Sequence, residues 1–134
     1  MTDTHPPGTP PTTVSDEECL ARFILFQKWV RTDQTVRPDA FIPHPYPDLS
    51  VTRHTELSNA ELWQVGQRIA NNRSRTLYGR ADIQALEVKK RSLCIQPTLT
   101  PKNHANINGW PVDKPAQKMI AQELAAVASF TSKP

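Results

Sequence analysis

The chain has 134 residues, the length of one domain and too short for a large two-domain enzyme. Hydrophobic residues make up 37% of it, below the usual share of a folded chain but well above that of a disordered one. The formal net charge of +3 conceals an asymmetry, since residues 1–67 carry 5 Lys/Arg against 9 Asp/Glu and residues 68–134 carry 11 against 4. This asymmetry favours an acidic partner.

Several classes of protein are excluded by composition. No apolar run approaches the roughly 20 residues of a membrane span, and the N-terminus lacks the basic and apolar regions of a signal peptide. Cys19 and Cys94 have neither the number nor the spacing of zinc ligands, and we interpret both as small buried hydrophobes. We therefore expect a cytoplasmic protein with no metal and no cofactor.

The N-terminal part of the chain changes character at Ser15. Residues 1–14 are rich in Pro and Thr and are expected to form a disordered tail, followed by one α+β domain over 15–131 and a short tail at 132–134. The motif from Ser15 to Glu18 has the pattern of a helix capping box. The apolar run after it favours a short helix leading into a strand near 21–26.

The middle of the chain alternates between loops and regular elements. Residues 32–48 contain four prolines and predict a long loop, anchored by Phe41, Ile42 and Tyr46. Residues 49–53 alternate as a strand does, and a second capping box at Ser58 predicts a helix over 58–72.

The second half of the chain carries shorter signals. We expect a strand or bend over 76–83, a helical turn within 84–91, and strands over 93–95 and 104–107. Asp113 and Pro115 open a helix over 114–129. These elements predict a small α+β domain of about four short strands with two or three helices.

Two histidines are the candidate acid/base residues. His54 follows Arg53 at the end of a predicted strand, and His104 lies in a second polar cluster. Arg80 and Asp82 would share one face of a strand, where they either pair or bind a polar ligand. Arg53, Arg80 and Asp82 are thus candidate ligand-binding residues.

The segment 103–111 is dense in hydrogen-bonding groups. It holds His104 and three asparagines, which suit either a polar ligand or turn formation. Asn106, Asn108 and Trp110 are its candidate ligand-binding residues. No Gly-rich phosphate loop, paired-carboxylate motif or metal-binding helix motif accompanies them.

The segment 68–91 is the most basic part of the chain, with seven Lys/Arg against two Asp/Glu. Arginines bind phosphate and carboxylate through paired hydrogen bonds, but few aromatic residues lie nearby to stack on bases. Besides Arg80, the residues of this predicted basic face are Arg68, Arg73, Arg75, Lys89, Lys90 and Arg91.

Three functions remain open at this point. The favoured one is a small non-enzymatic binding or accessory protein that uses the basic face and the Asn/His segment on an acidic protein partner. The alternatives are a small enzyme acting on a nucleotide or nucleic-acid phosphate, with His54 and His104 as acid and base, and a nucleic-acid-binding module. The strings 39–43, 49–53 and 103–107 resemble small bacterial proteins, which implies a bacterial origin but no activity.

Overall fold

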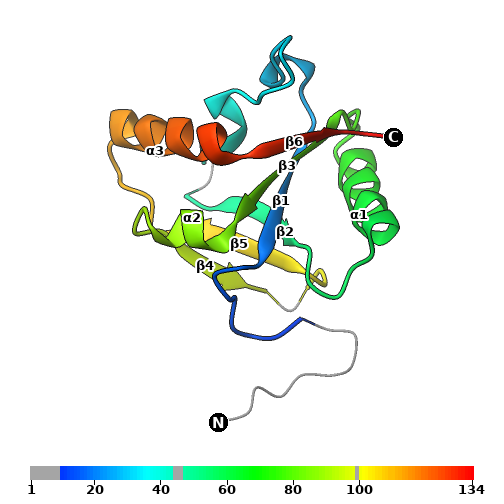
Figure 1. Ribbon diagram of the computed structural model, residues 1–134, viewed down its shortest axis with the longest axis horizontal. Helices are drawn as coiled ribbons and strands as arrows, with labels where there is room; N and C mark the ends of the chain where they lie inside the picture. Colours follow the sequence, from blue (N-terminus) through cyan, green and yellow to red (C-terminus); the bar gives the residue numbers. More distant parts are fainter. Residues whose placement is uncertain (1–9, 44–46, 99) are drawn as a thin grey trace.

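A six-stranded antiparallel sheet forms the centre of the fold (Figure 1), with the strands in the order β4–β5–β2–β1–β3–β6. The computed structural model describes residues 10–43, 47–98 and 100–134. The strands are β1 (Cys19–Ile24), β2 (Leu49–Arg53), β3 (Gly79–Gln84), β4 (Cys94–Pro97), β5 (His104–Asn108) and β6 (Ser129–Ser132). The helices are α1 (Asn59–Asn72), α2 (Ala85–Lys89) and α3 (Lys114–Val127), with short 3-10 turns η1 (Gln27–Trp29) and η2 (Pro38–Phe41).

The two faces of the sheet are covered unequally (Figure 1). One face packs against α2, α3 and η2 and forms the larger core, in which Leu20, Ile24 and Phe41 are buried. The other face packs against α1 alone, through a smaller cluster that includes Phe23 and Leu62. The molecule is thus a small single domain of mixed helix and sheet, as expected, but with six strands instead of about four.

Helix α1 begins where the sequence predicts it. The Ser58 hydroxyl accepts a hydrogen bond from the Glu61 amide, and the Glu61 carboxylate accepts one from the Ser58 amide, which completes the capping box. Gly66 allows the helix to lie close to β1, because a Cβ there would come within 2.5 Å of the Phe23 ring. Helix α1 is therefore held firmly over β1.

The sequence predicts a short helix before the first strand, and this prediction is wrong. The Ser15 amide does bond to the Glu18 carboxylate, but the Glu18 amide bonds to the Ser15 carbonyl and closes only a turn. Strand β1 then starts at Cys19, with Leu20 facing the larger core and Phe23 the smaller one. A strand buried on both faces gives a continuous apolar run, which a helix can also give.

The sixth strand is the element that the sequence does not predict. Strand β6 follows α3 after a single residue and pairs with β3, with Arg80 opposite Thr131. Three of its four residues are Ser or Thr and only Phe130 packs on the core, so it carries little hydrophobic signal. It includes Ser132, which was expected in a C-terminal tail.

The long loop and the N-terminal segment both pack against the sheet. Phe41 is fully buried and Ile42 packs on the core, whereas Tyr46 lies outside the described residues. Val14 is also buried. The packed chain therefore begins before Ser15, while residues 1–9 of the expected tail lie outside the described part.

A buried ion pair joins the N-terminal segment to β2. The Arg53 side chain is 1% exposed and donates two hydrogen bonds of 2.8 Å to the Glu18 carboxylate. Its Nη1 also donates to the Pro11 carbonyl at 2.6 Å. Burial raises the pKa of the Glu18 carboxyl, but the hydrogen bonds from Arg53 and Ser15 outweigh it and hold this pKa below its usual value.

We expect Glu18→Gln to destabilise the fold by about 3–5 kcal/mol at neutral pH, because Arg53 then stays buried without its counter-charge. The pKa of the native Glu18 carboxyl is depressed. Its contribution to the free energy of unfolding is therefore present above the pKa of the unfolded state and is lost as the pH falls through the pKa of the folded state. Denaturant unfolding at a series of pH values should show the gap between the variant and the native protein closing below about pH 4.5. The exposed neighbour Glu17 supplies the control, Glu17→Gln, and a gap that does not change with pH would contradict the assignment.

Candidate functional site

The sheet opens between β1 and β2, and an arginine occupies the opening. The ladder between these strands includes only Leu20 opposite Arg53 and Ala21 opposite Thr52. Beyond it, the Arg22 side chain donates through Nη1 to the Ser50 carbonyl at 3.0 Å and through Nε to the Ala40 carbonyl at 2.8 Å. Arg22 therefore supplies, from a side chain, a hydrogen bond that a strand neighbour would otherwise supply.

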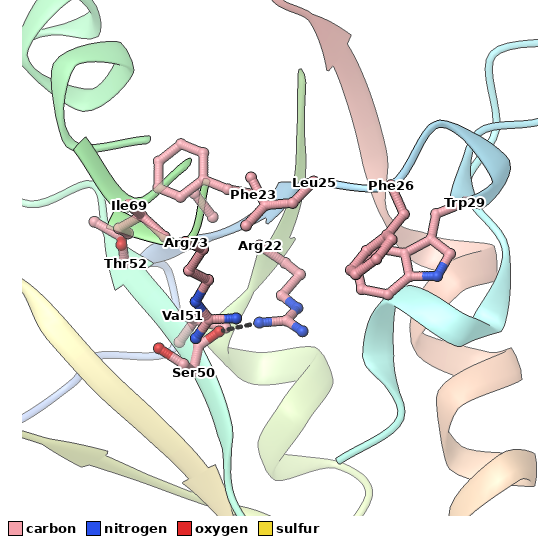
Figure 2. Close-up of a pocket in the computed structure, with 11 residues that line it drawn as sticks. Arg22, Phe23, Leu25, Phe26, Trp29, Ser50, Val51, Thr52, Ile69 and Arg73 are labelled. Carbon is pink, nitrogen blue, oxygen red and sulfur yellow. Dashed lines mark hydrogen bonds between the residues drawn. The ribbon is translucent and has the colours of Figure 1, made fainter. Parts of the chain in front are cut away.

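A second arginine approaches the first at this point. Arg73 caps the C-terminus of α1, and its guanidinium group lies beside that of Arg22 (Figure 2). In the described part of the chain, neither group forms an ion pair. Burial and, to a smaller extent, the positive charge of Arg73 lower the pKa of Arg22 to about 10. Two cations thus converge here without an ion pair to either, and the one acidic residue that lines the adjoining hollow is Asp39.

Aromatic side chains lie beside the guanidinium group of Arg22. The rings of Phe26 and Trp29 lie 4.5 Å apart, with the Arg22 guanidinium 5.8 Å from the Trp29 ring and the Arg75 guanidinium 4.1 Å from the Phe26 ring. An open hollow of about 450 Å³ extends from there. We call it the arginine hollow; its lining residues are Arg22, Phe26, Lys28, Trp29, Asp39, Ile42 and Arg73.

Three of the predicted site residues form a separate cluster near α1. The His54 Nε2 lies 3.0 Å from Asp82 Oδ1, and Arg80 Nε donates to Asp82 Oδ2 at 3.0 Å. The Arg80 guanidinium stacks on Trp63 of α1 at 4.6 Å. A carboxylate that holds an imidazole in this way can orient a general base. Burial raises the pKa of the neighbouring Cys19 thiol, which keeps it protonated and unsuited to act as a nucleophile.

The structure does not bring Arg53 and His104 into this cluster. Arg53 is buried in its ion pair with Glu18, so it cannot contact a ligand. His54 bonds to Asp82 on β3, whereas His104 lies on β5, and β2 and β1 separate those two strands. The two imidazoles therefore face different partners.

His104 is held by two hydroxyl groups. Its Nε2 lies 2.7 Å from the Ser50 hydroxyl and its Nδ1 lies 2.8 Å from the Thr98 hydroxyl. Burial lowers the pKa of His104 below its usual value, so the neutral ring is favoured at pH 7. This hydrogen-bond network joins β2, β5 and the segment after β4.

The remaining residues of the Asn/His segment have structural contacts. Asn106 lies opposite Ser50 and Gln96 in the sheet, and the Asn108 amide donates to the Gln96 side chain at 2.9 Å. The Trp110 indole donates to the Ile107 carbonyl, and its ring packs on the larger core. The density of polar residues in this segment comes from a strand that turns one face to the less covered side of the sheet.

The predicted basic face is divided between the two sides of the sheet. Arg68 and Arg73 belong to α1 and its C-cap on one side, whereas Lys89 lies on α2 on the other. The three basic residues at α2 also have acidic partners: Lys89 pairs with Asp16, Lys90 with Glu87, and Arg91 with Glu87 and Glu123. Within this segment, the arginines that have no ion pair to a described residue, Arg68, Arg73 and Arg75, lie on α1 or just after it, so the segment does not form one continuous face.

Arg22 is the site residue that sequence reasoning missed. The sequence carried one signal for it, an arginine inside the apolar run of residues 20–26. An arginine in a buried strand needs acceptors for its guanidinium group, and here the carbonyls of Ala40 and Ser50 provide them. Neither acceptor can be identified from the sequence, because one lies in a loop and the other in a different strand.

No protein-family model, curated protein or solved structure matches this chain. Among the described residues, no helix is long and apolar enough to cross a membrane. The same residues contain no group of three or more His, Cys, Asp or Glu side chains that could hold a metal ion.

We expect the imidazole of His104 to titrate below pH 6.5 in an NMR titration, because burial disfavours its charged form. Its folded pKa is depressed, so the linked stability is present above pH 6.5 and is lost as the pH falls through the folded pKa. His104→Gln identifies the resonance and removes this part of the pH dependence. A midpoint at or above 6.5 would contradict the buried, neutral ring.

Proposed function

We propose that this protein is a small non-enzymatic binding module that takes an acidic segment of a protein partner in the arginine hollow. The observation that carries the proposal is the convergence of Arg22 and Arg73 without an ion-pair partner in the described chain. Two neighbouring cations repel one another, and a bound carboxylate relieves that repulsion.

The chemistry of these groups suits binding and not proton transfer. A guanidinium with a pKa of about 10 stays charged at neutral pH, so Arg22 neither accepts nor donates a proton in a reaction. It has more N–H donors than the carbonyls of Ala40 and Ser50 use, and those carbonyls hold it in place. A guanidinium fixed in this way loses little freedom when a carboxylate binds.

The aromatic residues favour a protein over a nucleic acid. Phe26 and Trp29 already stack on each other, and guanidinium groups lie over both rings. Single-stranded nucleic acids need free ring faces on which bases stack. The hollow therefore offers charge and an apolar edge, which suits acidic side chains next to apolar ones.

The catalytic alternative has less support. It requires His54 and His104 to act on one substrate, within hydrogen-bond reach of the atoms that gain and lose protons. Their partners, Asp82 on β3 and Ser50 on β2, lie on different strands.

The test compares two variants that remove the same charge in different places. Arg73→Gln empties the hollow of one cation, whereas Lys90→Gln removes an exposed cation on the other side of the sheet. We expect Arg73→Gln to weaken binding of a fluorescent decaglutamate peptide by about tenfold, the loss of one charge-assisted contact, and Lys90→Gln to leave it nearly unchanged. Fluorescence anisotropy at low and physiological salt measures both affinities.

The stability of the variant separates binding from folding. Arg73→Gln should not lower the free energy of unfolding, because it removes a repulsion with Arg22 and breaks no ion pair. Equal effects of the two variants on peptide binding, or no binding at low salt, would overturn the proposal. Tighter binding of an oligothymidylate of equal charge would favour the nucleic-acid alternative instead.

A further inference from the structure

A second cavity lies where α1 leaves the sheet uncovered. Helix α1 packs over β1 and contacts β3 through Trp63 and Arg80, whereas the adjoining face of β2 and β5 carries polar side chains, among them His104 and Asn106. Between this face and α1 the structure forms a cavity of about 270 Å³. This volume lies just below the range of typical ligand pockets, and it suits a small molecule.

The lining of the cavity divides into an apolar part and a cationic part. Leu57, Val65 and Ile69 supply apolar surface from the start of α1 and its sheet-facing side. Arg68 and Lys102 approach from the helix and from the loop before β5, and neither has an ion pair within the described residues. A molecule with an apolar body and one anionic end fits this division.

One carboxylate also lines the cavity, but it is already engaged. Glu61 Oε1 accepts the hydrogen bond of the Ser58 amide at the start of α1. This bond and the nearby Lys102 lower the pKa of Glu61, the first of them more strongly. Arg68 and Lys102 together still leave the lining with an excess of positive charge.

The wall of the cavity contains an acceptor without a donor. Asn103 is 1% exposed and adopts a left-handed backbone conformation with φ 69°. Its amide nitrogen donates to the carbonyls of Arg53 and Thr55, which identifies the other atom of the amide as the oxygen. That Oδ1 has no hydrogen-bond partner among the described residues. A buried acceptor without a donor is energetically unfavourable.

We propose that this cavity is a binding site for a small organic carboxylate with a compact apolar body. Arg68 and Lys102 hold the carboxylate, and the apolar body lies against Leu57, Val65 and Ile69. The site is separate from the arginine hollow, so it does not rest on the function proposed above.

Three simple probes test the two halves of the site. Phenylacetate carries both the apolar body and the charge, phenylacetamide only the body, and acetate only the charge. We expect phenylacetate to bind more tightly than either of the others, by about tenfold or more. Amide chemical shifts in NMR titrations measure the affinities, and the largest changes should occur along α1 and at residues 101–104.

Variants then assign the binding to this cavity. Lys102→Gln should weaken phenylacetate binding by about tenfold and leave phenylacetamide nearly unchanged. Val65→Phe should fill the cavity and abolish binding of both aromatic probes, and its folding is checked by thermal unfolding. If Val65→Phe does not fold, the smaller substitution Val65→Leu is used in its place. The effects of Val65→Leu and Lys102→Gln on phenylacetate binding then test the proposal.

The control is Arg73→Gln, which removes a cation from the neighbouring hollow and should leave phenylacetate binding unchanged. This variant also separates the two proposals, because it should weaken binding of the decaglutamate peptide whereas Lys102→Gln should not. Three results would overturn the proposed carboxylate site. They are equal binding of phenylacetate and phenylacetamide, no binding of phenylacetate at millimolar concentration, and equal losses of phenylacetate affinity in Lys102→Gln and Arg73→Gln.

Discussion

A guanidinium group takes the place of a strand neighbour where β1 and β2 separate. The ladder ends after Ala21 and Thr52, and Arg22 satisfies the Ser50 carbonyl that would otherwise lose its donor. A buried carbonyl without a donor is costly, so the opening of the sheet needs such a group. The same side chain fixes η2 through the Ala40 carbonyl. One side chain thus determines three features of the structure: the opening of the sheet, the path of the long loop and a cation of the arginine hollow.

The second constraint is the unequal cover of the sheet. Helices α2 and α3, together with η2, close one face, whereas α1 alone lies over the other (Figure 1). One helix cannot cover six strands, so part of that face stays polar. The hydroxyls of Ser50 and Thr98, which hold His104, belong to this uncovered part. Both proposed sites lie along the edges of α1, where cover by the helix ends.

The sequence predicts the strongly marked elements well. Capping boxes and caps are local, so Ser58 and Asp113 mark the starts of α1 and α3 within one residue. Strand β2 has the predicted bounds, Leu49–Arg53, because alternation along a strand is also a local pattern. At β1, where burial on both faces removes the alternation, the sequence predicts a strand near 21–26 but wrongly places a helix before it. The pattern fails at β6, where pairing with β3 orders a polar segment.

The sequence by itself determined that this chain forms a small α+β domain, because caps, apolar periodicity and proline positions act over a few residues. The sequence also identified His54, Arg80 and Asp82 as candidates, and in the structure the Asp82 carboxylate contacts both of the other side chains. Only the tertiary structure decided which cations are neutralised. Lys89 and Arg91 meet acidic partners distant in the chain, whereas Arg22 and Arg73 meet each other. Net charge along a sequence cannot predict this, since it depends on which side of the sheet each helix packs.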